Sequence, residues 1–259
     1  MSFQINRYNL FSIKFFFIIT YIFFLSNILI AEVKIIKNNV ERCFFTDVTP
    51  NHVIGQFPTK GNPNSFKKQN LKFCTSLSPV INNNYTHKAR TVGITLSGIP
   101  IRPNTADWYD PKSPKGHSKK NTSGWNLEGI TPYKKKLGID GNNGHVDKNG
   151  LYHYHGANNY LLNLGQNSLI GYAADGHEIH YLGSKIKSSW KLINGTRPTM
   201  PYGKYDGSFF QDYEFIKDSG DLDECNFGEI KNKKVYFATN EFPFFPRCLW
   251  GEPSKYFLR

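Results

Sequence analysis

Alternating tyrosine and histidine residues form the segment of this sequence that is best suited to chemistry. The run reads Tyr152-His153-Tyr154-His155. On an extended strand, the two histidines point to one face and the two tyrosines to the other. The histidine Cα atoms are then about 6.5 Å apart, two strand rises. The two imidazoles can therefore converge on one ion or one ligand.

The residues just before this strand predict a hairpin that adds a third histidine. Asp147–Gly150 reads Asp-Lys-Asn-Gly, which fits a type I turn followed by a glycine in the left-handed region. This turn pairs His145 with His153, so His145, His153 and His155 share one face. A slip of one residue would move the partner strand's side chains to the opposite face, so the prediction depends on the turn type.

Three histidines on one hairpin face predict a metal site. Imidazole suits zinc and copper, and three such ligands can leave one coordination position open. The predicted ligands are therefore His145, His153 and His155, with zinc or copper as the candidate cofactor. The alternative is a hydrogen-bonded cluster in which the histidines and tyrosines only support packing.

Three functions remain open from these residues. The first is a divalent-metal-binding protein without turnover. The second is a metal-dependent hydrolase, for which Asp140 and Asp175 are the nearby carboxylates that could act as acid or base. Tyr152 and Tyr154 are further candidates for supporting the ligands or moving a proton. The third is a polysaccharide-binding or cell-surface interaction module with structural histidines.

The positive charge of the chain gives only a weak indication of a partner. The formal net charge is +12 over 259 residues, but the lysines are scattered, and Lys134–Lys136 is the only short run. A solvated basic surface is expected, with an anionic polysaccharide or cell-envelope component as the candidate partner. No nucleic-acid motif is present, and a nucleophile motif of the Gly-x-Ser-x-Gly type is absent.

The N-terminus predicts export. Residues 1–31 combine Arg7, Lys14, a long apolar run and the small residue Ala31, as signal peptides do. Cleavage before Glu32 would give a secreted or periplasmic protein, and a retained N-terminal anchor is the alternative. No later segment is apolar enough to span a membrane.

Four cysteines are expected to be oxidised in such a compartment, namely Cys43, Cys74, Cys225 and Cys248. Disulfide bonds are the ordinary state of an even number of cysteines in an exported protein. The spacing alone leaves three possible pairings open.

Short apolar runs separated by glycine and proline predict a mainly β fold, a sandwich or barrel built of hairpins with few short helices. The stretch 170–179 aligns without a gap with 92–101, which predicts two equivalent hairpins in one β structure; chance similarity is the alternative, since glycine is expected at turns. A short helix is expected over Tyr160–Gln166. Residues 32–88 form a polar N-terminal segment in which Val33–Val40 could be a strand.

The stretch 137–156, LGIDGNNGHVDKNGLYHYHG, resembles the signature of the YHYH family of exported bacterial proteins. Supporting stretches follow in order at 169–176, 205–214, 220–226 and 241–251. The resemblance implies an exported YHYH domain over residues 89–251, with a tail at 252–259, and it does not by itself imply a reaction. The sequence departs from the family after Asp175-Gly176, so His177 and His180 are left out of the predicted site, and His177→Ala is expected to leave metal binding nearly unchanged.

The resemblance also favours one cysteine pairing. Cys225 and Cys248 lie in the family-like C-terminal part, whereas Cys43 and Cys74 lie in the N-terminal segment. The expected disulfides are therefore Cys225–Cys248 and Cys43–Cys74, each worth roughly 2–4 kcal/mol.

Overall fold

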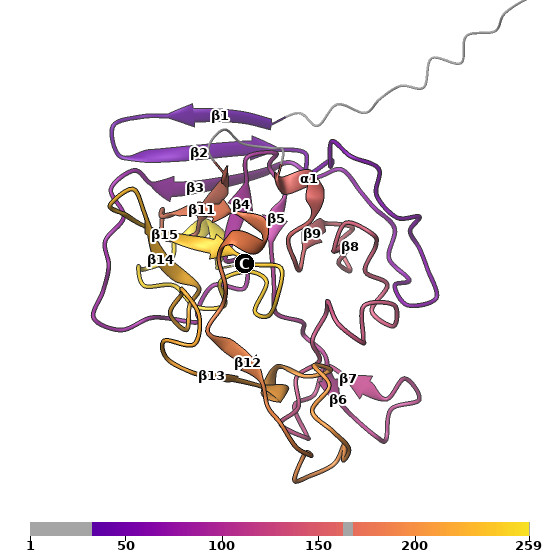
Figure 1. Cartoon of the computed structure of the whole chain (residues 1–259). Helices are drawn as coiled ribbons and strands as arrows, with labels where there is room; N and C mark the ends of the chain where they lie inside the picture. The colour runs from indigo at the N-terminus through magenta and orange to yellow at the C-terminus, as the bar shows by residue number, and fades with distance from the viewer. Residues whose placement is uncertain (1–32, 163–167, 259) are drawn as a thin grey trace, which may run out of the picture.

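The computed structural model describes residues 33–162 and 168–258, and they form a mainly β structure without a closed barrel (Figure 1). The strands are β1 Val33–Lys37, β2 Glu41–Thr46, β3 Leu71–Ser76, β4 Gly93–Thr95, β5 Pro100–Ile101, β6 Trp108–Tyr109, β7 His117–Ser118, β8 Gly144–Val146, β9 Tyr152–Tyr154, β10 Leu169–Ala173, β11 Glu178–Tyr181, β12 Trp190–Leu192, β13 Tyr213–Phe215, β14 Phe227–Ile230 and β15 Lys233–Ala238. Among the described residues, α1 spans Asn159–Leu162, and single 3-10 turns lie at Gly183–Lys185, Phe210–Asp212 and Lys255–Phe257.

The largest sheet has eight strands in the order β14-β15-β11-β10-β4-β5-β9-β8. The two predicted hairpins, β4–β5 and β10–β11, lie side by side at its centre, because β4 pairs antiparallel with β10. A Cβ atom at Gly171 would collide with the carbonyl oxygen of Ile94 on the neighbouring strand, so this close approach requires glycine. The short strand β5 then pairs in parallel with β9, which attaches the histidine hairpin to this sheet.

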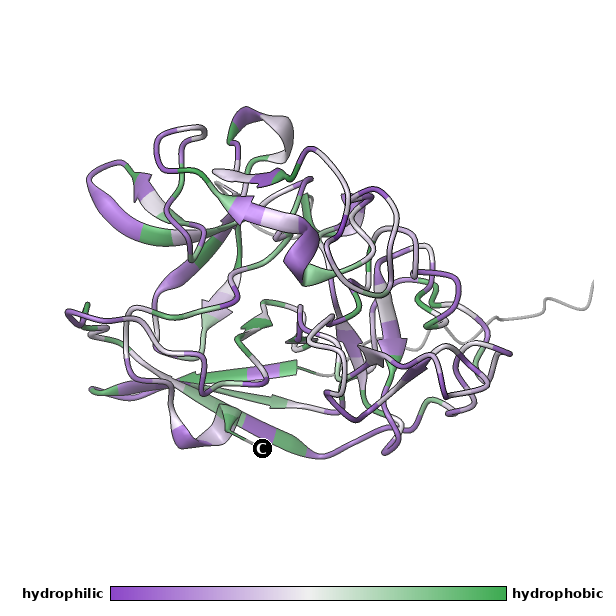
Figure 2. Cartoon of the chain, turned by 90° about the horizontal axis from the view of Figure 1, so that it is seen from below, coloured by the Kyte–Doolittle hydropathy of each residue, from purple (hydrophilic) through white to green (hydrophobic). Residues whose placement is uncertain are grey.

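The N-terminal segment belongs to the same hydrophobic core. Strands β1, β2 and β3 form a three-stranded antiparallel sheet that lies along one side of the larger sheet (Figure 1). Phe44 of β2 and Phe73 of β3 are buried in the main core cluster together with Ile94 and Tyr172, and the rings of Phe44 and Tyr172 are 6.1 Å apart. The hydrophobic residues lie mainly on the strands, and the outer loops are largely hydrophilic (Figure 2).

Two small two-stranded sheets, β12–β13 and β6–β7, lie at the end of the molecule away from the N-terminal sheet (Figure 1). A second buried cluster, which contains Trp125, Leu127 and Phe209, fills this end. The described part of the expected helix over Tyr160–Gln166 is helical only as far as Leu162, and the rest of that prediction lies outside the described residues.

Both expected disulfides are present. Cys43 on β2 is bonded to Cys74 on β3, and Cys225 is bonded to Cys248. Disulfides persist in oxidising compartments, which agrees with the export expected from residues 1–31, although that segment lies outside the described residues. Among the residues that the structure describes, no helix has the length and apolarity needed to cross a bilayer.

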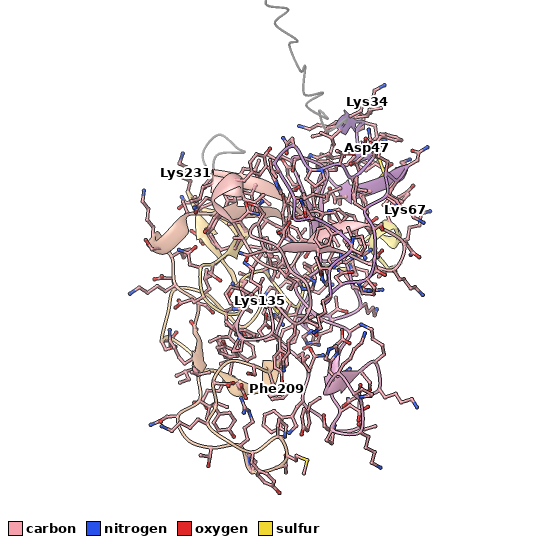
Figure 3. All side chains as sticks on the ribbon, turned by 90° about the vertical axis from the view of Figure 1, so that its right-hand side faces the viewer. Lys34, Asp47, Lys67, Lys135, Phe209 and Lys231 are labelled. Atoms are coloured by element: carbon pink, nitrogen blue, oxygen red, sulfur yellow. A yellow bond between two sulfur atoms is a disulfide. The ribbon has the colours of Figure 1, made fainter. Side chains whose placement is uncertain are left out.

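The lysines are distributed over the surface, as the sequence predicted. Lys34, Lys67 and Lys231 lie at different edges of the molecule in a view of all side chains (Figure 3). All three side chains are exposed, so their charges are solvated at separate places on the surface.

Candidate metal centre

The hairpin β8–β9 has the register that the turn sequence predicted. Val146 pairs with Tyr152, and His145 pairs with His153. The carboxylate of Asp147 accepts the backbone N–H groups of Asn149 and Leu151, which closes the loop. Gly150 has φ = +83°, the left-handed region that the G1 bulge requires.

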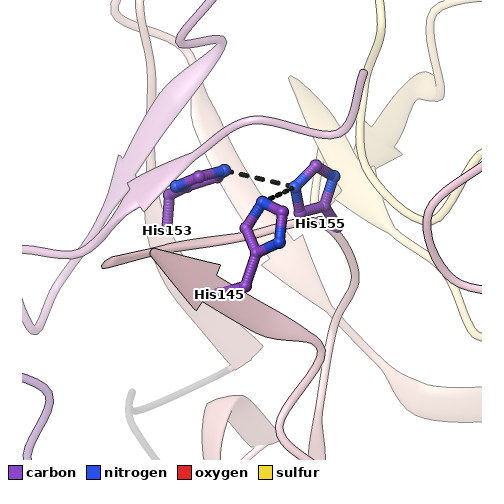
Figure 4. A group of neighbouring side chains, drawn as sticks. All are labelled: His145, His153 and His155. Carbon is purple, nitrogen blue, oxygen red and sulfur yellow. Dashed lines mark hydrogen bonds between the residues drawn. The ribbon is translucent and has the colours of Figure 1, made fainter. Parts of the chain in front are cut away.

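The three histidines of this hairpin converge on one point (Figure 4). Nε2 of His155 lies 3.1 Å from Nε2 of His145 and 3.2 Å from Nε2 of His153. Three imidazoles bound to one tetrahedral ion through bonds of about 2.0–2.1 Å would have their nitrogens about 3.3 Å apart. The two separations from His155 match this requirement closely, and the candidate ligand atoms of all three histidines lie within 4.8 Å of one another.

The outer nitrogen of each ring is fixed by a backbone carbonyl. Nδ1 of His145 donates to Leu137 at 2.9 Å, Nδ1 of His153 donates to Leu151 at 3.1 Å, and Nδ1 of His155 donates to Pro103 at 3.2 Å. A carbonyl only accepts hydrogen bonds, so each Nδ1 carries the proton of its ring. In three neutral rings, the three Nε2 atoms therefore face one another with lone pairs and without protons.

Protonation of an Nε2 atom would relieve the contact between the three lone pairs, but burial of the rings opposes it. His153 and His155 are almost fully buried, at 3% and 2% exposure. Burial, together with the neighbouring histidines, lowers the pKa of both rings well below its ordinary value, and burial also lowers the pKa of His145. Neutral imidazoles with aligned lone pairs are the form that binds metal ions.

The three imidazoles open onto a cavity of about 530 Å³. His145 is the most accessible of the three. Lys115, Lys119, Lys148 and Arg90 line the same cavity. A ligand can therefore reach the point where the Nε2 atoms meet.

A fourth histidine in this cavity was not predicted from the sequence. His117 lines the cavity, and its Nδ1 lies 3.1 Å from Oδ1 of Asp107. The other oxygen of Asp107 accepts a hydrogen bond from Nζ of Lys119 at 2.7 Å. A histidine oriented by a carboxylate is an arrangement that can accept or donate a proton.

The four other residues proposed for the site lie outside the cavity. Tyr152 and Tyr154 are fully buried in the core on the opposite face of the strand. The hydroxyl group of Tyr152 donates to Asp140, which also accepts the backbone N–H groups of Asn142 and Gly144. Asp175 instead accepts hydrogen bonds from the hydroxyl group of Tyr236 and the backbone of Gly251.

The described residues contain one further cluster of residue types that can bind metals, namely Glu41, Cys43 and Cys74. Both cysteines are joined in a disulfide, so they offer no thiolate to a metal ion. The histidine cluster therefore remains the candidate metal centre.

A buried ion pair lies behind the cavity. Glu128 is inaccessible to solvent and Arg247 is 5% exposed. Nη2 of Arg247 lies 2.5 Å from Oε2 of Glu128, and Nη1 donates to Asn104, which lines the cavity. This pair ties the C-terminal part of the chain to the wall of the site.

Comparison with known proteins places this hairpin in a family. No curated protein and no solved structure matches the chain. The family model described as YHYH protein matches residues 72–251, which is more than half of the chain and includes the whole hairpin. The match begins before the domain start expected at residue 89 and therefore takes in strand β3 except its first residue, Leu71. The chain belongs to the YHYH family.

Proposed function

We propose that this protein binds one divalent metal ion through the Nε2 atoms of His145, His153 and His155. The observation that carries the proposal is the set of three Nδ1–H groups held by backbone carbonyls. This arrangement leaves three lone pairs aimed at one point, and such a point is favourable only when a cation occupies it. The carbonyls also fix each ring in the orientation that the ion needs.

The donor set favours zinc or copper over hard cations. Magnesium and calcium prefer oxygen ligands, whereas imidazole suits zinc and copper. The cavity in front of the histidines leaves room for a further ligand. This is the pattern of a site that binds an exchangeable molecule, since purely structural zinc sites are closed by four protein ligands.

Titration of the metal-free protein, prepared without a histidine tag, with zinc tests the proposal. We expect about one equivalent to bind by equilibrium dialysis with elemental analysis. Zinc at 100 times its Kd should stabilise the fold by about 2.7 kcal/mol, a rise in Tm of about 5–10 °C for a chain of this size. Magnesium at the same concentration should neither bind nor raise the Tm. Zinc binding far below one equivalent would contradict the proposal.

A metal-dependent hydrolase is the second candidate function, and the His117–Asp107 pair is the observation that favours it. An ion with an open position lowers the pKa of a water molecule and supplies a nucleophile near neutral pH. His117 shares the cavity with the three ligands and is oriented by Asp107. It is therefore placed to accept a proton from a molecule in that cavity.

Hydrolysis of 4-nitrophenyl acetate by the zinc-loaded protein would measure this activity. His117→Ala should lower the rate by about 100-fold, a typical contribution of a general base, while zinc stoichiometry stays at one. The control is His180→Ala, since His180 pairs with Glu178 outside the cavity. Equal rates for the His117 variant and the wild type would show that His117 takes no part in the reaction. The absence of any zinc-dependent hydrolysis would contradict the hydrolase function.

A further inference from the structure

A second cavity adjoins the one that contains the histidines. It has a volume of about 220 Å³. Arg90, Asp147 and Asn149 line both cavities, so the two meet at these residues. Together they fall in the size range of about 300–1,000 Å³ that is typical of ligand sites.

Positive charge exceeds negative charge along this space. Arg90 and Arg102 lie close enough for the charge of Arg90 to lower the pKa of Arg102, behind the larger effect of burial. The single carboxylate between the cavities, Asp147, pairs with Arg102 at 2.8 Å. Arg90, Lys115 and Lys148 form no ion pair with any residue that the structure describes, so their charges remain available to a ligand.

The uncharged part of the lining can bind hydroxyl groups. The amides of Asn62, Asn64 and Asn149 line the first cavity, and that of Gln69 lines the second. Side-chain amides both donate and accept hydrogen bonds, as sugar hydroxyl groups do. Apart from the histidines, the aromatic residues in the two linings are Phe73 and Tyr256. Sites that bind single-stranded nucleic acid stack successive bases on aromatic side chains, so this lining does not favour a nucleic acid.

We propose that the two cavities together bind an acidic oligosaccharide, with its anionic groups near Arg90 and Lys148 and one end at the three histidines. The surplus of cations selects the negative groups, and the amides bind the hydroxyl groups. Only the placement of one end of the oligosaccharide at the histidines rests on the proposed metal site. The charge recognition does not depend on a bound ion.

Calorimetric titration of the metal-free and the zinc-loaded protein tests this proposal. The probes are an oligogalacturonate, which carries carboxylates, a heparin-derived oligosaccharide, which carries sulfates, and an uncharged chito-oligosaccharide. At least one acidic probe should bind, with an affinity that falls as salt is raised, and the uncharged probe should bind at least tenfold more weakly. The better acidic probe identifies whether carboxylates or sulfates are preferred.

Two double variants remove the same charge at different places. Arg90→Gln with Lys148→Gln should weaken binding of the acidic probe by about tenfold, because both residues line the cavities. Lys185→Gln with Lys217→Gln removes two exposed lysines elsewhere and should change the affinity by less than about twofold. Thermal unfolding of both variants confirms that they fold.

Equal losses in the two double variants would show binding to the general basic surface and would overturn the proposal. Tighter binding of single-stranded DNA than of either acidic oligosaccharide would overturn it in favour of nucleic acid. If the protein bound zinc but no oligosaccharide, the proposed metal site would stand and the oligosaccharide site would be wrong. If the protein bound the oligosaccharide through Arg90 and Lys148 but did not bind zinc, the oligosaccharide site would stand and the metal site would be wrong.

Discussion

His153→Ala is expected to abolish stoichiometric zinc binding. The substitution removes one of three converging Nε2 atoms and leaves two ligands where three hold the ion. Residues that only orient the ligands contribute about 10–100-fold to metal affinity, so loss of a ligand should cost more than 100-fold. Equilibrium dialysis at micromolar zinc should then find far less than one equivalent bound.

His87→Ala is the matched control for this variant. His87 lies on the surface outside the cavity, where Nδ1 bonds to the carbonyl of Arg247. It should retain one equivalent of zinc, and the same result is expected for His177→Ala, because His177 lies beside Asp175, away from the site. Full zinc binding by the His153 variant would mean that the ion is held elsewhere.

Glu128→Ala is expected to lower the free energy of unfolding by about 3–5 kcal/mol, the range observed when one partner of a buried ion pair is removed. Arg247 would keep a charge in an interior where it is 5% exposed, without the carboxylate that lies 2.5 Å from it. Unfolding in urea, followed by tryptophan fluorescence, measures the difference.

An exposed pair in the same chain provides the comparison. Lys88 and Glu252 form an ion pair at 3.2 Å, and both side chains are more than 60% exposed. Glu252→Ala should change the stability by at most about 1 kcal/mol. If the two glutamate variants lost similar amounts of stability, burial would not be the cause of the larger effect.

The local sequence was sufficient to predict the histidine hairpin. Asp147–Gly150 specifies one turn type, and that turn fixes the register that brings His145 beside His153. The alternation of strand residues then adds His155 to the same face. The paired glycine hairpins were predictable for the same reason, because turn residues act over a few positions.

Contacts between distant segments could not be predicted in this way. His117 reaches the cavity because β7 pairs with β6, next to Asp107, and no spacing pattern links this segment to the hairpin. Asp140 is close to the hairpin in sequence, but its carboxylate is bound to Tyr152 on the opposite face. The carbonyl of Pro103 that orients His155 is likewise supplied by a segment far away in the chain.

The charged junction between the two cavities also depends on long-range packing. Arg90 and Arg102 flank the β4–β5 hairpin, whereas Asp147 belongs to the histidine hairpin. The parallel pairing of β5 with β9 brings the two hairpins together. Parallel neighbours are joined by long connections, so their partners cannot be read from adjacent residues.

A crystal structure of the zinc-loaded protein, with anomalous scattering recorded at the zinc absorption edge, tests the central claim most directly. We predict one strong anomalous peak about 2.0–2.1 Å from Nε2 of each of His145, His153 and His155. Each Nδ1 should remain bonded to its backbone carbonyl. The absence of a peak at this point, or coordination of an ion by other residues, would contradict the account.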